Sequence, residues 1–399
     1  MSKIYLLFIL FFLFIKCDSN PGIIESILNK DISEIRKVMI NKKKHEIQIL
    51  LSQVKRDKSG NISFIEDSYQ LDENKYFYPA STAKLPIAIL ALQKIKSLRD
   101  QGIPINADTP FLIKNKNGET IIDKDSTNIN GDVTINHLIK KIFLVSDNDA
   151  YNYLFDFLGR DYINNELIKI GLKKTQIHHK FLLGADNVNT WEYTFIDENQ
   201  NKIFHQSSMS SKYTLEPHKL NGVLKGKGYI SSGKLINEPM KFDKKNRISI
   251  RDLQGILKRI IFPEEFNKKE RFELEDTDYK FLRYWMSRTT LESNYPNYKD
   301  QEYWDSYCKF FIYGDKKGAM TPEIRIYNKV GFAYGTLTDV AYIKDNNTGL
   351  DFFLTATVLV NENQIFNDNN YEFEELGIPF LASLGREILI ELNKQLFFY

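Results

Sequence analysis

The order of its predicted elements constrains the fold of this 399-residue chain most strongly. Two segments near the N-terminus, residues 46–54 and 61–66, are predicted to be strands, and the polar turn between them makes them a hairpin. Three further strands are predicted late in the chain, at about 324–331, 338–344 and 352–360. Helical segments separate the two groups. The early and late strands must therefore meet in one sheet, which predicts an α+β fold.

Helices are predicted where apolar residues recur every three or four positions. These segments are residues 22–44, a strong helix starting at Ser81, residues 134–144, residues 148–158, residues 249–261 and residues 380–392. Gly159 is well suited to end the fourth of them.

Two long segments fit neither helix nor strand well and are interpreted as insertions in a single domain over residues 22–399. Residues 190–245 are rich in Gly, Ser and Lys, and we expect a few strands there. Residues 288–322 are dense in aromatic side chains. These aromatic residues either pack the insertion on the domain or line a substrate groove: Tyr295, Tyr298, Tyr303, Trp304 and Tyr307.

The N-terminus has the pattern of a secretory signal. Lys3 precedes an apolar run from Ile4 to Ile15, which is too short to span a bilayer comfortably, and a polar stretch follows. Cys17 stands where a bacterial lipoprotein is cleaved and lipidated, although Lys16 replaces the usual small residue before it. We predict a signal peptide of lipoprotein type over residues 1–17 and a membrane-anchored protein in the periplasm or cell envelope. An ordinary cleaved signal is the alternative.

Charge and cysteine content exclude several classes of function. The net charge of +2 provides no broad positive field, so no nucleic-acid partner is expected. Cys17 and Cys308 are the two cysteines, so a mature chain without Cys17 has no internal disulfide. No metal-binding motif appears among the scattered histidines, and we expect neither a metal site nor a cofactor.

The first motif with chemical meaning is Ser81-Thr82-Ala83-Lys84 at the start of a predicted helix. Residues three apart share one helix face, so the lysine amine can reach the serine oxygen. Serine is a weak nucleophile that needs an adjacent base, and a helix N-terminus favours developing negative charge. By itself the pattern is weak, because Ser81 can equally be a helix N-cap.

Two further motifs follow at predicted breaks in regular structure. Ser146-Asp147-Asn148 lies between two helices, where Ser146 can relay a proton and Asn148 can hold a substrate amide, although all three residue types also cap helices well. Lys329-Val330-Gly331 lies near the end of a strand. Gly331 would let a substrate backbone approach the strand edge, and Lys329 would place a positive charge beside Ser146. An ordinary edge-strand lysine is the alternative.

Together, S-x-x-K, S-D-N and K-x-G in this order form a specific combination. On these motifs the chain resembles the class A β-lactamases and related penicillin-recognising serine hydrolases over nearly its whole mature length. The stretch from Gly335 to Asp339 adds to the resemblance. The resemblance implies a β-lactamase/transpeptidase-like α+β fold, with an antiparallel sheet flanked by helices and an all-helical lobe.

The resemblance also implies roles for individual residues. Ser81 would attack a carbonyl and form an acyl-enzyme, with Lys84 as general base and Ser146 as proton shuttle. Lys329 would tune the Ser146 hydroxyl electrostatically, and Asn148 would hydrogen-bond the substrate amide. The backbone N–H groups of Ser81 and Phe332 would form the oxyanion hole. Substrate binding is thus assigned to the following residues: Asn148, Lys329, Gly331 and Phe332.

Two departures from the family pattern affect the expected activity. Val330 replaces the Thr or Ser whose hydroxyl helps to bind the substrate carboxylate, a loss of about 1.5–3 kcal/mol. Aligned on Asn187, the loop after S-D-N has Leu183 where class A enzymes have the Glu that activates the deacylating water. Glu192 or Glu198 would have to reach back to replace it. Acylation would proceed and deacylation would stall.

Three functions remain open from the sequence. The leading one is a secreted β-lactamase-like serine hydrolase that is acylated at Ser81 by lactam, amide or ester substrates. A narrower version is a D,D-peptidase or penicillin-binding protein that acts on peptidoglycan peptides. A non-catalytic cell-envelope binding protein of the same fold is the third, but such a protein usually loses some of the residues that remain here.

Overall fold

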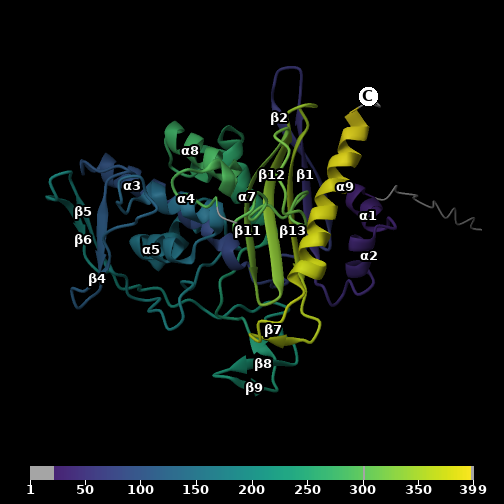
Figure 1. The fold of residues 1–399 in the computed structure, drawn as a ribbon, viewed down its shortest axis with the longest axis horizontal. Coiled ribbons are helices and arrows are strands. Elements are labelled where there is room, and N and C mark those ends of the chain that lie inside the picture. The colour runs from purple at the N-terminus through teal and green to yellow at the C-terminus, as the bar shows by residue number, and fades with distance from the viewer. Residues whose placement is uncertain (1–21, 300–301, 397–399) are drawn as a thin grey trace, which may run out of the picture.

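A five-stranded antiparallel sheet forms the centre of the computed structural model, which describes residues 22–299 and 302–396 (Figure 1). The strands follow the order β11-β12-β13-β1-β2. They are β1 (Gln48–Arg56), β2 (Ile62–Tyr69), β11 (Ile324–Ala333), β12 (Thr336–Asp345) and β13 (Asp351–Leu359). β1 pairs with β13 in antiparallel register, so the early and late strands meet in one sheet and the prediction is confirmed.

Three helices from the two ends of the chain cover one face of this sheet (Figure 1). They are α1 (Ile23–Leu28), α2 (Ser33–Met39) and α9 (Ile378–Leu396). The predicted single helix over residues 22–44 is wrong, because the chain turns between Asn29 and Ile32. The turn lets both short helices bury their apolar side chains against α9 and the sheet, which one straight helix would not achieve.

The other face of the sheet is covered by α7 (Ile250–Ile261) and α8 (Asp276–Ser287). The first was predicted and the second was not. α7 is tied to the sheet by a buried polar contact, in which Gln254 donates to the carbonyl oxygen of Leu50 over 3.0 Å. Such buried bonds fix the position of the helix, because an unsatisfied amide in the core is costly.

The helical lobe packs around one apolar core beside the sheet. It contains α3 (Lys84–Asp100), α4 (Ile135–Val145), α5 (Asn148–Leu158) and α6 (Arg160–Lys169), and a 3-10 turn at Ala80–Ala83 leads into α3. The predicted helices after Ser81, at 134–144 and at 148–158 are confirmed. α3 is buried on nearly all sides over its first ten residues, which identifies it as the centre of the lobe.

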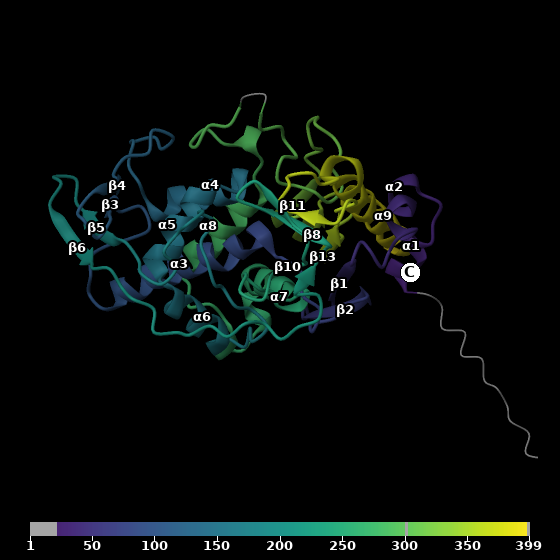
Figure 2. The same cartoon turned by 90° about the horizontal axis from the view of Figure 1, so that it is seen from below.

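The region 190–245 contains short strands, as expected. These strands belong to separate small sheets at two places in the fold, where some of them pair with strands from outside the region. At the far end of the helical lobe a second sheet has the order β4-β3-β5-β6 (Figure 1). Its strands are β3 (Phe111–Lys114), β4 (Thr120–Ile122), β5 (Glu192–Ile196) and β6 (Lys202–Gln206). The later strands lie past the lower end of the main sheet in Figure 1 and therefore in front of it when the molecule is seen from below (Figure 2), and they include one partner from near the C-terminus. They are β7 (Leu224–Lys225), β8 (Gly228–Ser231), β9 (Lys234–Ile236), β10 (Met240–Lys241) and β14 (Ile365–Phe366).

Single helical turns complete the described elements. They are the 3-10 turns Pro263–Glu265, Lys268–Glu270 and Thr290–Glu292 and the π turn Phe373–Gly377. The predicted signal segment 1–17, with Cys17, lies outside the described residues. Within residues 22–299 and 302–396, no helix has both the length and the hydrophobicity to cross a bilayer.

Candidate active site

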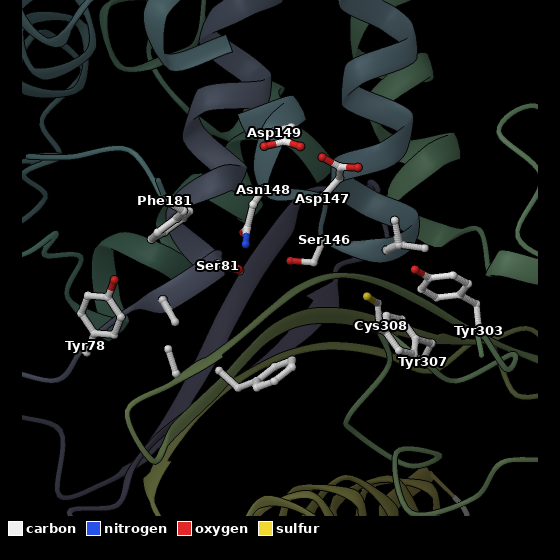
Figure 3. A pocket seen from close by; sticks show the side chains of 14 residues that line it. Tyr78, Ser81, Ser146, Asp147, Asn148, Asp149, Phe181, Tyr303, Tyr307 and Cys308 are labelled. Atoms are coloured by element: carbon white, nitrogen blue, oxygen red, sulfur yellow. The ribbon is translucent and has the colours of Figure 1, made fainter. Parts of the chain in front are cut away.

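The three sequence motifs converge on one pocket of about 480 Å³ between the helical lobe and the edge of the sheet (Figure 3). Ser81, Ser146, Asn148 and Phe332 line this pocket. Lys84 and Lys329 are buried directly behind Ser146 and contact it. Six of the seven residues selected from the sequence thus lie in or directly behind one cavity of ligand-binding size.

Ser81 lies in the 3-10 turn Ala80–Ala83, directly before α3. The preceding residue, Ala80, has a φ of 45°, which is unusual for a residue with a side chain. Strained backbone of this kind persists where the surrounding structure fixes it and is frequent at functional sites. The turn presents Ser81 at the bottom of the pocket, between Phe181 and Ser146 (Figure 3).

Lys84 is completely buried, and its ammonium group contacts the S-D-N turn. Nζ donates to the carbonyl oxygen of Ser146, to Asn148 Oδ1 over 2.7 Å and to Ser146 Oγ over 3.4 Å. Burial lowers the pKa of Lys84 well below its usual value, and the positive charge of Lys329 lowers it further. A neutral lysine amine can accept a proton, which is what a base for Ser81 requires. Within the described residues no hydrogen bond joins Lys84 to Ser81 itself.

Ser146 connects the two buried lysines. It lies between α4 and α5 with a φ of 58°, and Asp147 caps α5 by accepting from the Ala150 N–H over 2.8 Å. Lys329 Nζ donates to Ser146 Oγ over 2.8 Å, and burial lowers the pKa of Lys329 to about 8. A hydroxyl between Lys84 and Lys329 is well placed to pass a proton from one side to the other.

One contact and the direction of its side chain fit the expected role of Asn148. Its Oδ1 is occupied by Lys84, so the amide nitrogen is the group left for a ligand. Figure 3 shows the side chain pointing into the pocket toward Ser81. The lysine thus fixes the orientation of the amide before a substrate arrives.

Gly331 has a different role from the one expected. It lies on the edge strand β11, directly behind the nucleophile turn, and does not line the pocket. A Cβ atom at Gly331 would lie 2.6 Å from the Pro79 carbonyl oxygen and 2.8 Å from the Ser81 nitrogen. The glycine therefore lets the strand approach the turn that carries Ser81, rather than a substrate backbone.

Val330 also differs from the expectation drawn from the sequence. Its side chain is buried in the core between the sheet and α9 and does not line the pocket. In a strand, successive side chains point to opposite faces, so the residue between Lys329 and Gly331 faces away from them. A hydroxyl at this position would be in the core, so Val330 does not explain altered substrate binding.

Comparisons with known proteins agree with this geometry. The family model described as the beta-lactamase enzyme family matches residues 31–373. The chain belongs to this family. No curated protein sequence matches it significantly. The structure of the penicillin-binding protein named PBP-A matches with a TM-score of 0.51 and 13% identity, covering 93% of this chain and 96% of that one. A β-lactamase from Xanthomonas campestris matches with a TM-score of 0.49 and 15% identity, over 92% and 97%. At 13% identity the PBP-A structure supports the fold alone. As a family member, the chain is a β-lactamase-like serine hydrolase, in a family whose substrates are small-molecule lactams.

The loop after the S-D-N motif differs from the class A pattern, and its alignment from the sequence was wrong. Leu183, aligned with the class A Glu, is fully exposed. Phe181 lies at the pocket instead, with its ring centroid 5.3 Å from Lys84 Nζ. Glu192 and Glu198 do not line the pocket, since they belong to β5 and the turn after it. The group above Lys84 is therefore an aromatic ring.

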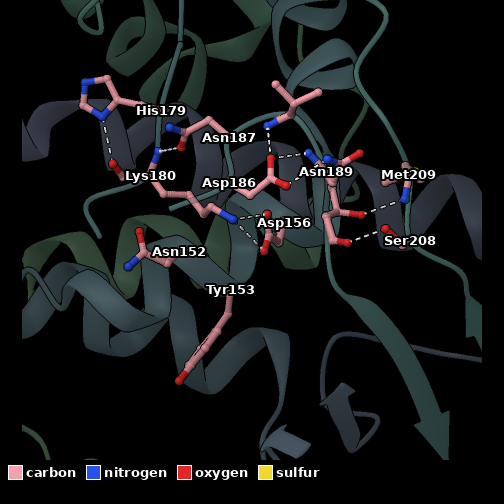
Figure 4. A network of polar contacts seen from close by, with 12 residues as sticks. Asn152, Tyr153, Asp156, His179, Lys180, Asp186, Asn187, Asn189, Ser208 and Met209 are labelled. Atoms are coloured by element: carbon pink, nitrogen blue, oxygen red, sulfur yellow. Dashed lines mark hydrogen bonds and ion pairs between the residues drawn. The ribbon is translucent and has the colours of Figure 1, made fainter. Parts of the chain in front are cut away.

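A buried polar network fixes this loop (Figure 4). Lys180 and Asp156 form a buried ion pair, with Nζ 2.9 and 3.0 Å from the two carboxylate oxygens. Desolvation raises the pKa of Asp156 to about 6. Asn187 accepts from the Lys180 N–H and Asn152 from the Phe181 N–H, each over 2.8 Å. These contacts hold Phe181 over Lys84. They could not be predicted from the sequence, because no local pattern indicates them.

The aromatic insertion supplies the opposite wall of the pocket. Tyr303, Tyr307 and Cys308 line it on the side of Ser146 (Figure 3). Trp304 does not line it and packs against Tyr307 of the same insertion. The aromatic side chains thus divide between the pocket and the interior of the insertion, and a substrate groove stays a prediction. Burial raises the pKa of the Cys308 thiol, which keeps it protonated. Cys308 was not among the site residues predicted from the sequence, because an isolated cysteine carries no positional signal.

Proposed function

We propose that Ser81 is acylated by lactams and by peptidoglycan peptides, and that lactam acyl-enzymes are hydrolysed slowly. The chain would then act as a penicillin-binding D,D-peptidase rather than as an efficient β-lactamase. The observation that supports this most is Phe181: the loop after S-D-N, which carries the deacylating Glu in class A enzymes, places an aromatic ring over Lys84 and no carboxylate in the pocket. An aromatic ring cannot activate the water that releases a lactam acyl group.

The acylation step follows from the contacts of the pocket. Ser81 Oγ attacks the substrate carbonyl carbon while its proton passes to the neutral Lys84 amine. The oxyanion is stabilised by the backbone N–H groups of Ser81 and Phe332. When the carbon–nitrogen bond breaks, Ser146 gives its proton to the leaving nitrogen and is reprotonated by the Lys84 ammonium. Lys329 stabilises the transient negative charge on Ser146 Oγ.

The proposed substrates imply a location at the cell envelope. We extend the proposal to export by the signal segment and to anchoring by a lipid on Cys17. Palmitate labelling of cells that express the full chain tests this. Label in the wild type and none in Cys17→Ser is expected, whereas equal labelling would reject the anchor.

The test of the proposed activity is intact-mass spectrometry of the protein after incubation with a fluorescent penicillin and with a chromogenic cephalosporin. A lasting adduct with little turnover is expected, and Ser81→Ala should form none. Rapid turnover without a lasting adduct would identify an efficient β-lactamase. Neither adduct nor turnover would favour the binding-protein alternative. An adduct retained in Ser81→Ala would reject the nucleophile.

A further inference from the structure

A second cavity of about 490 Å³ lies beside the active-site pocket. It is formed by the loop from His179 to Asn187, by Tyr334 after β11, and by Lys244 and Lys245 at the end of the 190–245 insertion. Tyr78 and Phe181 line both cavities. The two spaces therefore share a wall of two aromatic side chains.

The second cavity has an excess of positive charge. Three lysines line it, and no Asp or Glu does. Lys180 is neutralised by Asp156, whereas Lys244 and Lys245 have no ion-pair partner within residues 22–299 and 302–396. Lys245 is half-buried, with Nζ 5.8 Å from the centroid of the Tyr334 ring. Burial lowers its pKa with no carboxylate to offset the effect, so an anion brought to this ammonium group would be stabilised.

Lys245 is also held in place by its neighbour. Asn246 Oδ1 accepts from the backbone N–H groups of His178 and His179 over 2.8 and 3.0 Å. The Asn246 carbonyl oxygen accepts from the Tyr76 hydroxyl over 2.9 Å. These bonds tie the end of the insertion to the loop that carries Phe181. A cation on such a fixed backbone can select a ligand group by position.

The position of the cavity indicates which part of a substrate would reach it. Figure 3 places Ser146 on one side of Ser81 and Tyr78 and Phe181 on the other. In the proposed reaction the leaving nitrogen lies next to Ser146, so the acyl group extends toward Tyr78 and Phe181. Tyr78 and Phe181, which line both cavities, therefore lie between the acyl side of the substrate and Lys245. A side group of the substrate that passes these two residues reaches the second cavity.

We propose that this cavity is a subsite for a carboxylate on the acyl side of the substrate, held by Lys245 with Lys244 beside it. The inference rests on the proposed function and narrows its substrates to acyl donors that carry an anionic side group. It also gives the end of the 190–245 insertion a role in substrate selection.

Benzylpenicillin and α-carboxybenzylpenicillin test the inference, because they differ by one carboxylate on the acyl side chain. The measurement is the second-order rate constant of Ser81 acylation for each compound and the ratio of the two. In Lys245→Met the ratio, carboxylated over uncarboxylated, should fall about ten-fold or more, the effect of losing one charge-assisted contact. Lys245→Arg should retain the ratio. Lys234→Met, on the exposed strand β9 of the same insertion, is the matched control and should leave it unchanged. An unchanged ratio in Lys245→Met would overturn the proposal.

The two hypotheses fail in different ways. If benzylpenicillin acylates Ser81 but the ratio does not respond to Lys245, only the subsite is rejected. If neither penicillin acylates the protein, or Lys245→Met does not fold, calorimetry on Ser81→Ala still decides about the subsite. Binding of α-carboxybenzylpenicillin at least five-fold tighter than benzylpenicillin, with the preference reduced in Ser81→Ala/Lys245→Gln, supports it. Equal affinities for the two penicillins reject it.

Discussion

Two walls of the same pocket differ in how closely they follow the class A pattern. The first wall, from the turn before α3, the α4–α5 junction and β11, brings Ser81, Lys84, Ser146 and Lys329 together around one cavity. The second wall, the loop after His179, places the Phe181 ring over Lys84 and no Asp or Glu in the pocket. Under the proposed function, acylation and deacylation therefore depend on different structural elements, so that one step can change while the other is kept.

The two walls are also stabilised in different ways. Lys84 lies at the start of a helix buried in the core of the lobe, so a change there disturbs the packing around it. The loop is fixed by its own polar contacts, mainly the Lys180–Asp156 ion pair and Asn187 (Figure 4). At the tip of the loop, Leu182 and Leu183 are exposed. A surface loop of this kind tolerates substitutions that the first wall does not.

The strongest test of the first wall is Lys84→Met. Loss of the base should slow acylation by benzylpenicillin by about 10²–10⁴-fold. Lys94→Met is the matched control, since Lys94 is a half-buried lysine on the same helix α3 that lies away from the pocket. Acylation of the control should stay within about two-fold of wild type in a rapid-quench mass measurement. Wild-type acylation in Lys84→Met would show that another group removes the proton.

The second wall is tested by Phe181→Glu, which restores a carboxylate above Lys84. Deacylation of the penicillin adduct should become at least about ten-fold faster, because a general base contributes about 10²–10⁴-fold where it is well placed. The lifetime of the adduct in intact-mass spectra measures this. Phe181→Gln has the same shape without the base and should not shorten the lifetime. Equal lifetimes in both variants would mean that the loop does not determine deacylation.

The pH dependence of the acylation rate tests whether the positive charge of Lys329 is needed, or only the presence of its side chain. Burial lowers the pKa of Lys329 to about 8, so its ammonium charge is present below this pH and is lost as the pH rises through it. The acylation rate should therefore fall above about pH 8, approaching a ten-fold loss for each further unit. In Lys329→Arg the guanidinium stays charged, and this alkaline limb should disappear. A flat wild-type profile from pH 7 to 10 would contradict the role given to Lys329.

The smallest expected effect concerns the contact between β11 and the nucleophile turn. Gly331→Ala should lower the free energy of unfolding by about 1–3 kcal/mol, because its Cβ meets backbone atoms that cannot move away easily. Urea denaturation measures this change. Gly318→Ala has no neighbouring atom within 4 Å and should be close to neutral. Equal stability of the two variants would show that the turn relaxes without cost.

Much of the fold could be predicted from the sequence because its signals are local. The hairpin at 46–66, the helix after Ser81 and the late strands all follow from short apolar repeats. The break between α1 and α2 was missed, since the same repeat continues across it and only packing on α9 requires the turn. α8 was also missed, and it lies between the predicted helix at 249–261 and the aromatic insertion at 288–322, in a segment for which no element was predicted.

The candidate site also contains residues that could be predicted from local patterns and residues that could not. The motifs S-x-x-K and S-D-N were informative because each places its residues within one helical turn or one helix junction. The roles of Leu183 and Val330 were misjudged. Side-chain direction in the loop depends on bonds from Asn152 and Asn187, and the face of Val330 depends on where the core lies.

The sequence by itself determined the candidate nucleophile, the two lysines and the serine between them, because these residue types and their order are typical of one chemistry. Only the tertiary structure decided how they are arranged. The burial of Lys84, which lowers the pKa of its amine, comes from packing between α3 and the S-D-N turn. Two further contacts join segments that are distant in the chain: β11 approaches Ser81, and Phe181 lies over Lys84. No local sequence pattern indicates which distant segments meet in space.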